Sequence, residues 1–595
     1  MPTRLKTDRR LMLRFTSLLL STLLPFIAVS APNLPREDRE PEAKTGFEIK
    51  KSVSGKKYMV VAANPYAAKA GQEILAKGGS AIDAAIAIQA VLTLVEPQSS
   101  GIGGGAFLMH FDKENNQLIT YDGRETAPSA ATASLFLDPH TGKPVPWIKA
   151  VVGGRSVGVP GVVAAMNKAH QQHGHLPWAE LFAPAIELSQ EGFVVSSRLE
   201  KLLSKKFNPG VHQIEGTKAY FFPNGEALKA GTVKKNPQLA AFYQRLAKEG
   251  AAAFYHGDNA EKIANTVQNS AIAPGVLTVK DINGYQAKTR PAVCAPYKKY
   301  KICSMGPPSS GGVAVLQILK LLEDKNISQY PPNDKEALHY FTQASRLAFA
   351  DRDVFLADPD FNNIDVTQLL TPEYLKERAK LIKDHDMGVA VAGDPAIKLV
   401  KTPDDAYELP STSHFSIIDG KGNAVSMTTS IEMAFGSTLM VNGYLLNNQL
   451  TDFALSPHKN GQPLINRVEA NKRPRSSMSP VIVFNQDGSI RLIIGSPGGS
   501  RIINYVAHTM MAVLDWQLPV QEAINLAKIT NRNKITTLEK DTELAQLKEW
   551  FTNKGHTVRV ADLNSGLHGI EIVNGLLFGG ADPRREGVAM SETEH

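Results

Sequence analysis

The pattern of apolar and polar positions divides the chain into a helix-rich part up to residue 411 and a strand-rich part after it. Residues 59–79 predict a short strand followed by a helix that ends at a glycine pair. In residues 80–97, Ser80 and Asp83 have the spacing of a capping box, and the helix that follows is apolar on nearly all sides. A helix that is apolar all round is a buried one. We therefore expect layers of helix packed against sheet.

Strand-like runs recur along the chain, several of them separated by Asp-Gly, Gly-Asn or Asn-Gly pairs that are typical of tight hairpins. These runs are residues 107–112, 398–402, 413–419, 424–431, 443–448, 481–485, 492–495 and 569–575. Long helical stretches are predicted over residues 336–356 and 503–516. The expected fold class is therefore α+β, and there is no internal repeat.

The segment DPAIKLVKTPDDAYELPSTSHFS, residues 394–416, joins the two parts of the chain. Proline, aspartate and serine accumulate up to Pro410, and the strand pattern resumes at His414. We expect an exposed linker that runs directly into a strand. Such a junction suits a proteolytic processing site.

The first 30 residues have the layout of a secretory signal peptide. A basic segment precedes the apolar run of residues 15–29, and Ala28 and Ser30 are small residues placed as at a cleavage site. The alternative is an uncleaved membrane anchor, but this run is short of the roughly 20 apolar residues that a spanning helix needs. We expect an exported protein, periplasmic or secreted, without a stable membrane anchor. Residues 31–56 are polar and predict a flexible mature N-terminus.

Composition and charge narrow the class of protein. With 43% hydrophobic and 21% charged residues the chain is an ordinary globular protein. The formal net charge is +7, but the leader alone carries five basic side chains and one acidic one. About +3 then remains for the mature chain, which calls for no nucleic-acid partner.

Cys294 and Cys303 are the only cysteines. They flank a turn-like Ala-Pro segment between two strand-like stretches, so their side chains can meet across a hairpin. A disulfide is expected in an oxidising compartment and two buried thiols in a reducing one. Two cysteines without a CxxC motif exclude a cysteine zinc site.

Glycine and serine clusters carry little information one by one. GIGGGAF at 101–107 lacks the spacing of a dinucleotide loop, and GSPGGSR at 495–501 lacks the Lys-Ser/Thr ending of a phosphate loop. Each alone is typical of a tight turn.

Taken together and in order, however, eight motifs resemble the γ-glutamyltransferase (γ-glutamyltranspeptidase) family over residues 57–588. They are GIGGGAF, YDGRETAP, MGPPSSGG, STSHFSIID, LLNNQLTDF, NKRPRSSMSP, GSPGGSR and GGADPRREG. The resemblance implies a four-layer αββα sandwich of the N-terminal-nucleophile hydrolase type. Two fragments of one precursor would form it jointly: a large subunit, residues 57–411, and a small subunit, residues 412–595.

Members of this family cleave themselves. A threonine hydroxyl attacks the preceding peptide carbonyl, and the freed threonine amine becomes the base for its own hydroxyl. By similarity the cut falls between Ser411 and Thr412, and Thr412 is the nucleophile. An α-amino group, with an ordinary pKa of about 7.7 to 8.0, suits this work near neutral pH. Taken alone, Thr412 is only a residue that starts a strand.

The resemblance also implies a site that reads both ends of a γ-glutamyl group. Arg124, Ser476 and Ser477 match the residues that bind the α-carboxylate, where a guanidinium fork and two hydroxyls suit an anion. Gly498 and Gly499 match the oxyanion hole, where glycine lets backbone N–H groups approach the tetrahedral intermediate.

Gln449 and Asp452 match residues that bind the α-ammonium, and Glu432 stands where an asparagine is common in the family. A carboxylate still attracts an ammonium group, since hydrogen bonds with an ionised partner are roughly twice as strong. Ser430 replaces a second threonine that bonds the nucleophile, and it keeps the hydroxyl. The loop from Asp452 to Asn471 lacks the aromatic lid of well-known relatives, so a more open pocket is expected.

The implied activity is cleavage of γ-glutamyl amides such as glutathione through a Thr412 ester, with transfer to water, amino acids or peptides. No metal or organic cofactor is required, because the nucleophile, base and oxyanion donors all come from protein. The alternatives are a related amidohydrolase, such as a glutaryl-cephalosporin acylase or a poly-γ-glutamate depolymerase, and an inactive secreted binding protein.

Overall fold

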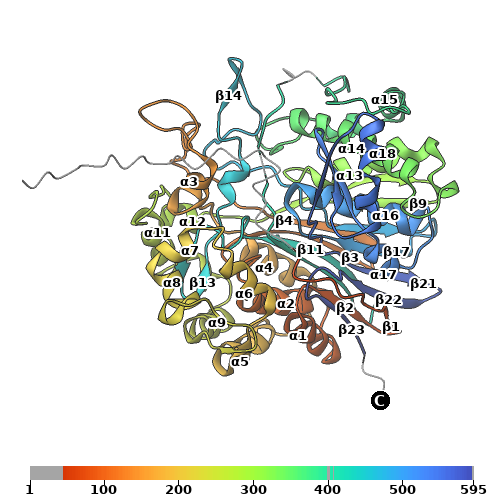
Figure 1. The fold of residues 1–595 in the computed structure, drawn as a ribbon. Coiled ribbons are helices and arrows are strands. Elements are labelled where there is room, and N and C mark those ends of the chain that lie inside the picture. Colours follow the sequence, from red (N-terminus) through yellow and green to blue (C-terminus); the bar gives the residue numbers. More distant parts are fainter. Residues whose placement is uncertain (1–43, 398–401, 407, 593–595) are drawn as a thin grey trace, which may run out of the picture.

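The computed structural model describes residues 44–397, 402–406 and 408–592. The signal peptide predicted at 1–30, the first part of the predicted flexible terminus and most of the strand predicted at 398–402 lie outside the described residues. The described chain is built around two large antiparallel sheets with helices on their outer faces (Figure 1).

Each of the two sheets has seven strands. The order in the first is β1 (Val53–Gly55), β22 (Leu576–Ala581), β21 (His568–Val573), β17 (Ile490–Gly495), β16 (Val481–Phe484), β9 (Tyr300–Ser304), β8 (Val293–Tyr297). The order in the second is β23 (Val588–Ser591), β2 (Met59–Ala62), β10 (Thr412–Ile418), β11 (Ala424–Ser430), β3 (Gly105–Asp112), β4 (Gln117–Gly123), β7 (Lys288–Arg290). Both sheets therefore combine strands from before and after residue 411.

The sheets pack face to face through apolar side chains that alternate along their strands. Met59 and Met109 from the second sheet meet Ile482, Ile493 and Ile570 from the first in one buried cluster. Alternation places every second side chain of a strand on the same face, so the opposite faces are left for helices.

Two groups of helices cover these outer faces. Helices α1 (Pro65–Ala76) and α2 (Ala81–Val95) share a core with the second sheet. Helices α13 (Gly311–Leu322), α14 (Lys335–Phe355) and α16 (Ile502–Leu514) share a core with the first. The result is the four-layer αββα sandwich that was expected.

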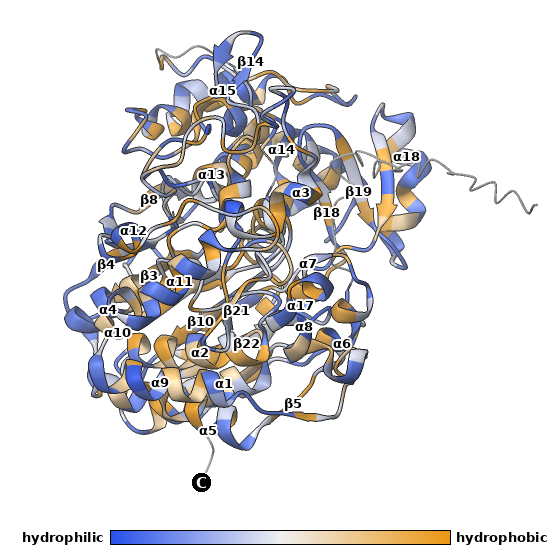
Figure 2. Cartoon of the chain, turned by 90° about the vertical axis from the view of Figure 1, so that its left-hand side faces the viewer, coloured by the Kyte–Doolittle hydropathy of each residue, from blue (hydrophilic) through white to orange (hydrophobic). Residues whose placement is uncertain are grey.

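Local sequence explains where these helices start and which faces they bury. The capping box of α2 is formed, since the Ser80 hydroxyl accepts from the Asp83 N–H at 3.2 Å and the Asp83 carboxylate from the Ser80 N–H at 2.8 Å. Every residue of α2 is buried. By contrast, α9 (Pro237–Glu249) lies at the surface and carries both hydrophilic and hydrophobic residues (Figure 2).

Most of the predicted elements are confirmed. The runs at 107–112, 413–419, 424–431, 481–485, 492–495 and 569–575 are strands, and the stretches at 336–356 and 503–516 are helices α14 and α16. The run at 443–448 is a strand only at β13 (Tyr444–Leu445). No helix in the described ranges is long and apolar enough to cross a membrane.

The prediction of a flexible terminus over residues 31–56 is wrong for its second part. The Thr45 and Glu48 N–H groups donate to the Arg584 and Pro583 carbonyls, both at 3.1 Å. Residues 53–55 then form β1, which pairs with β22. The partners lie more than 500 residues away along the chain, so the local composition gave no sign of them.

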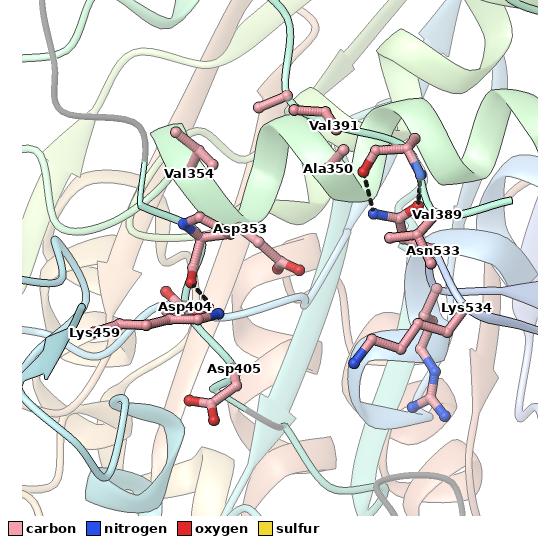
Figure 3. A pocket seen from close by; sticks show the side chains of 14 residues that line it. Ala350, Asp353, Val354, Val389, Val391, Asp404, Asp405, Lys459, Asn533 and Lys534 are labelled. Atoms are coloured by element: carbon pink, nitrogen blue, oxygen red, sulfur yellow. Dashed lines mark hydrogen bonds between the residues drawn. The ribbon is translucent and has the colours of Figure 1, made fainter. Parts of the chain in front are cut away.

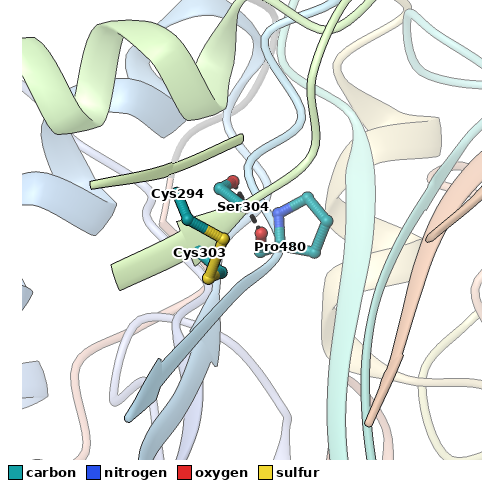
Figure 4. The surroundings of a disulfide bond; sticks show 4 residues. All are labelled: Cys294, Cys303, Ser304 and Pro480. Carbon is teal, nitrogen blue, oxygen red and sulfur yellow. Dashed lines mark hydrogen bonds between the residues drawn. A yellow bond between two sulfur atoms is a disulfide. The ribbon is translucent and has the colours of Figure 1, made fainter. Parts of the chain in front are cut away.

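A disulfide joins Cys294 and Cys303 with an S–S distance of 2.08 Å (Figure 4). The two cysteines face each other in the register of β8 and β9, as the hairpin prediction required. The turn itself was misplaced: it lies at Lys298–Lys299, and the Ala-Pro pair belongs to β8.

The disulfide lies one residue before a contact that leads toward the centre of the molecule. The Ser304 hydroxyl donates to the Pro480 carbonyl at 2.7 Å, just before β16 begins (Figure 4). Strand β9 then continues into the MGPPSSGG segment, where the Ser310 N–H donates to the Ser476 carbonyl at 2.7 Å. The edge hairpin is thus connected to the segment that carries Ser476 and Ser477.

Candidate active site

Thr412 is the first residue of β10, in the middle of the second sheet, and is 3% exposed. It lies opposite Ser430, the last residue of β11, in the strand register. The Thr412 hydroxyl donates to the Ser430 hydroxyl at 3.2 Å, and that hydroxyl donates to the Ser411 carbonyl at 3.1 Å. One chain of hydrogen bonds therefore joins the expected nucleophile to the carbonyl of the bond expected to be cut.

The position of Ser430 is fixed by its neighbours. The Glu432 N–H donates to the Ser430 oxygen at 2.8 Å, and Ser430 pairs with Gly105 on its other side. The backbone carbonyl of Thr412 accepts from the Arg585 guanidinium at 3.2 Å. Both hydroxyls are thus held by strand register as well as by side-chain contacts.

A buried cluster of charged and amide groups lies next to these hydroxyls. The Gln449 amide donates to Glu432 and to Asp452, both at 3.0 Å. Arg124 forms an ion pair with Asp452, and its Nε donates to the Pro474 carbonyl at 3.1 Å. The structure thus brings the expected ammonium-binding residues together and pairs one of them with the expected carboxylate-binding arginine.

The charges of this cluster are not balanced by its own residues. Burial raises the pKa of Glu432 well above its usual value, and the negative charge of Asp452 adds to this effect. Burial also raises the pKa of Asp452, although the Arg124 guanidinium opposes it. Two carboxylates with one guanidinium leave one acid without a cation. That arrangement favours a cationic group in the neighbouring space.

Ser476 and Ser477 lie beside this cluster. The Ser477 hydroxyl accepts from the Arg352 guanidinium at 3.0 Å, and the Ser476 hydroxyl accepts from the Met478 N–H at 3.1 Å. The guanidinium of Arg352 also donates to the Ser310 hydroxyl at 2.9 Å. The arginine on α14 therefore ties the MGPPSSGG segment and Ser477 together.

The glycine pair provides a close approach of backbone to backbone. Gly498 and Gly499 have φ of +136° and +56°, a region that favours glycine. A Cβ on Gly499 would lie 2.5 Å from the Glu408 carbonyl oxygen. Gly499 lines the same pocket as Thr412. In this uncleaved chain it faces the linker backbone.

The end of the linker fills the site, so the prediction of an exposed linker is wrong here. Glu408 and Leu409 are 3% exposed, and Ser411 is fully buried. The Leu409 N–H donates to the Glu432 carboxylate at 2.8 Å, and Glu408 forms an ion pair with Arg352. The remaining cavity is about 10 Å³, which is room for about one water molecule.

Three further residues contact this site although their sequence context predicted no role for them: Arg352, Glu408 and Arg585. Arg585 belongs to the GGADPRREG motif, which was a usable signal. Arg352 and Ser477 are 125 residues apart and Glu408 is a linker residue, so nothing in the local sequence marked them.

The loop without an aromatic lid forms a short hairpin of β14 (His458–Lys459) and β15 (Gln462–Pro463). Its strand residues are exposed. In the described part of the chain, no cluster of three or more histidine, cysteine, aspartate or glutamate side chains is arranged to hold a metal ion.

The segment GRSVG at 154–158 fits the GxSxG pattern of serine hydrolases, which sequence reasoning overlooked. Ser156 lies on a short 3₁₀ turn, not between a strand and a helix, and is fully buried. Its hydroxyl donates to the Gly153 carbonyl at 3.0 Å. The motif is therefore a structural turn.

Comparison with known proteins gives consistent findings. The family model described as Gamma-glutamyltranspeptidase matches residues 67–592. The chain is 36% identical over 586 residues to the glutathione hydrolase proenzyme of Bacillus subtilis (strain 168), covering 96% of this chain and 97% of that protein. It is 34% identical over 572 residues to the glutathione hydrolase proenzyme of Escherichia coli (strain K12), covering 94% and 95%.

A solved structure shows the same architecture. The cephalosporin acylase from Bacillus halodurans superposes with a TM-score of 0.79 at 26% identity, covering 96% of this chain and all of that one.

Proposed function

Since the chain belongs to the γ-glutamyltranspeptidase family, we propose that it is a glutathione hydrolase proenzyme that cuts itself between Ser411 and Thr412. The observation that carries the proposal is the hydrogen-bond chain from the Thr412 hydroxyl through Ser430 to the Ser411 carbonyl. It joins the proposed nucleophile, a proposed proton carrier and the carbonyl of the proposed scissile bond by hydrogen bonds, and this supports the proposal.

Self-cleavage is proposed to begin with attack of the Thr412 oxygen on the Ser411 carbonyl carbon. The peptide C–N bond breaks, the Thr412 nitrogen takes a proton, and Ser411 is left as an ester on the Thr412 oxygen. Water then hydrolyses that ester, which releases the Ser411 carboxylate. The products are a large subunit ending at Ser411 and a small subunit, residues 412–595, with a free amine at Thr412.

That amine is the proposed base of the mature enzyme. It accepts the proton of the Thr412 hydroxyl as the oxygen attacks the γ-carbonyl of the donor, and it returns the proton to the leaving amine. A γ-glutamyl ester on Thr412 results, which water, an amino acid or a peptide then takes up. Gly498 and Gly499 are the proposed oxyanion donors, since their backbone can approach closely.

Recognition of the glutamyl group is proposed to depend on charge at both ends. Glu432, Gln449 and Asp452 bind the α-ammonium, which supplies the cation that Glu432 lacks. Arg124, Ser476 and Ser477 bind the α-carboxylate. Glutathione and other γ-glutamyl compounds satisfy both requirements, and amino acids or peptides are the proposed acceptors.

The rival reading is an acylase, because a cephalosporin acylase shares the fold. A glutaryl group has no α-ammonium, so it would leave Glu432 in a buried place without a cation, since Arg124 is already paired with Asp452. Burying an unpaired charge is costly. The acidic cluster therefore favours the γ-glutamyl donor. A poly-γ-glutamate depolymerase would share the nucleophile but likewise has no need of an α-ammonium site, because the α-nitrogen of an internal unit is acylated. An inactive binding protein has no need of the hydrogen-bond chain at Thr412.

Export is part of the proposal. The leader pattern at 1–30 supports removal of a signal peptide and activity in the periplasm or outside the cell. A disulfide between Cys294 and Cys303 agrees with an oxidising compartment.

Two measurements test the proposal. Denaturing electrophoresis is expected to show two bands, and N-terminal sequencing of the smaller one is expected to start at Thr412. A single uncleaved chain would contradict the nucleophile assignment. Amine release from a γ-glutamyl anilide is expected to exceed release from the matching glutaryl anilide. Equal rates would contradict the ammonium site.

A further inference from the structure

A second cavity, of about 500 Å³, lies outside the site of Thr412 and has no role in the chemistry above. Its walls come from α14, the segment 389–392, the linker residues 403–405, Lys459 of β14 and the turn 532–534 (Figure 3). It is already open in the uncleaved chain, in contrast to the filled pocket at Thr412. We call it the outer cavity.

The outer cavity has one apolar side, formed by valine and alanine. Val389 and Val391 are 63% and 78% exposed, which is unusual for valines on an ordered segment. The segment is held in place because Asn533 and Ala390 exchange two hydrogen bonds, of 2.7 and 2.9 Å (Figure 3). A fixed apolar surface open to water is typical of a binding site.

Two of the acids on the walls of the outer cavity are compensated by arginines. Asp404 is compensated by two hydrogen bonds from Arg475, at 2.9 and 2.7 Å. Asp353 is compensated by Arg352 at 2.7 Å.

The other charged side chains on these walls are Asp405, Lys459, Arg532 and Lys534. Lys534 is exposed, and its ammonium group has no hydrogen bond or ion pair with the residues that the structure describes. The cavity therefore suits a ligand that carries a carboxylate.

The linker residues between Asp405 and Leu409 limit the distance between the outer cavity and the pocket of Thr412. Asp405 lines the outer cavity, and Leu409 lines the pocket of Thr412. The two residues are four positions apart, so at ~3.4 Å per residue the two spaces are separated by no more than about 14 Å of extended chain.

Two residues that line the outer cavity also contact residues around the site of Thr412. Arg532 lines the outer cavity and donates to the Ser500 hydroxyl at 3.1 Å, next to Gly499. Asp353 lines it too and binds Arg352, which donates to Ser477. The outer cavity therefore adjoins the proposed oxyanion and carboxylate-binding residues from outside.

We propose that the outer cavity binds the part of the substrate beyond the γ-glutamyl group: an amino acid or short peptide with an apolar side chain and a free carboxylate. The valines contact the side chain, and Lys534 binds the carboxylate. Lys534 is then a specificity-determining residue. This inference rests on the proposed function, because it needs a glutamyl group held at Thr412.

The test is the charge reversal Lys534→Glu in the cleaved enzyme, with Lys235→Glu as the matched control. Lys235 is also exposed and lies outside the walls of both spaces. The donors are glutathione, whose leaving part has a carboxylate, and a γ-glutamyl anilide, whose leaving part has none. We expect Lys534→Glu to raise KM for glutathione about five- to tenfold, as for reversal of a partly exposed ion pair, with kcat unchanged. The anilide and the control are expected to be unaffected.

A second arm separates the leaving part from the incoming acceptor. With the anilide as donor, transfer to a dipeptide and to the same dipeptide amide is compared. A raised KM for the dipeptide alone assigns the cavity to the acceptor, and an effect on glutathione alone assigns it to the leaving peptide. Either result supports the proposal.

Unchanged KM values in both arms would overturn the proposal. That result would follow if the cleaved linker remained in the outer cavity and kept the substrate out. Equal changes for charged and uncharged partners would overturn it too. A wild-type enzyme that cleaves neither donor would instead overturn the proposed function, and this inference with it.

Discussion

The Ser430 hydroxyl connects the two groups that react in the proposed self-cleavage. It accepts a hydrogen bond from the Thr412 hydroxyl and donates one to the Ser411 carbonyl. Family members usually have threonine at this position, yet only the hydroxyl enters these contacts. The role thus depends on one oxygen atom, and a substitution can separate it from the packing around it.

We expect Ser430→Ala to slow self-cleavage about a hundredfold, comparable to the loss of one donor to a developing oxyanion. The measurement is the time course of the two bands on denaturing gels after purification of uncleaved chain. Ser430→Thr keeps the hydroxyl and is expected to cleave at a rate close to wild type. Equal rates for all three chains would show that the hydrogen-bond chain has no part in cleavage.

Glu125, next to Arg124, is a second residue with an unusual environment. It is fully buried, and neither of its carboxylate oxygens has a hydrogen-bond partner among the residues that the structure describes. Burial raises its pKa to about 8, although the Arg124 guanidinium lies 3.7 Å away and opposes the shift. The ion-pair distance suggests a charged group, but without a hydrogen bond the cost of burial is the larger effect.

The pKa shift gives a pH-dependent stability. The folded chain binds this proton more tightly than the unfolded chain, so the contribution of Glu125 is fully favourable below the ordinary pKa of about 4.5 and is lost as the pH rises to about 8. Glu125→Gln keeps the neutral form at every pH. We expect the variant to match wild type near pH 5 and to be the more stable protein at pH 8.

The difference between the two proteins is expected to grow by at most ~1.4 kcal/mol per pH unit. Thermal unfolding followed at several pH values measures it, and exposed Glu114→Gln serves as control. A constant difference across this range would mean that Glu125 is ionised in the folded protein.

At the scale of single elements, the β8–β9 hairpin forms the edge of the first sheet, and only β9 is paired on both sides. The disulfide closes a loop between residues nine positions apart. Closing a loop of this size stabilises by about 2 to 3 kcal/mol through the unfolded chain. The hairpin is therefore the element that responds most to reduction.

We expect the double variant Cys294→Ser/Cys303→Ser to fold and to exchange the amide hydrogens of β8 and β9 up to ~100-fold faster, which corresponds to that free energy. Hydrogen exchange followed by mass spectrometry measures this. Adding reductant to wild type is expected to reproduce the change, and adding it to the variant to have no effect. Unchanged exchange rates of the β8 and β9 amides would mean that the pairing of β9 with its neighbours stabilises the hairpin without the disulfide.

How far the sequence predicted these elements depends on the distance between partners. The capping box of α2 and the strands β10 and β11 are local patterns, and they were confirmed. The burial of Leu409 depends on Glu432, and the order of residues 44–56 depends on β22 at the other end of the chain. Neither partner can be read from the segment itself.

In the candidate site, too, residues marked by local motifs were predicted and residues that depend on distant partners were not. The motifs indicated which residues gather around Thr412, because each motif was a short string that resembled the family. Arg352 was missed because it belongs to a helix whose pattern is fully explained by packing. Its contact with Ser477 arises only from the tertiary fold.

For the whole molecule, both proposed fragments contribute strands to each of the two large sheets. Strand β2 lies between β10 and β23, and β9 pairs with β16. Each pairing joins residues from before and after the proposed cut. Separating the fragments would expose strand edges and three shared apolar clusters to water.

We therefore expect the cleaved fragments to stay together. Gel filtration in native buffer is expected to give one peak that contains both bands, at the elution volume of the uncleaved Thr412→Ala chain. Two native peaks would contradict the interleaved sheets. In concentrated denaturant the two fragments are expected to separate.

The position of β2 between β10 and β23 also sets an order of events during synthesis. A nascent chain on the ribosome exposes β2 early. Strand β2 nevertheless lacks one neighbour until Thr412–Ile418 emerges and the other until Val588–Ser591 emerges, more than 500 residues after β2. Only then is the frame around Thr412 complete. Self-cleavage is therefore expected to depend on nearly complete synthesis. A prematurely terminated polypeptide that ends before β23 is not expected to cleave itself at Thr412.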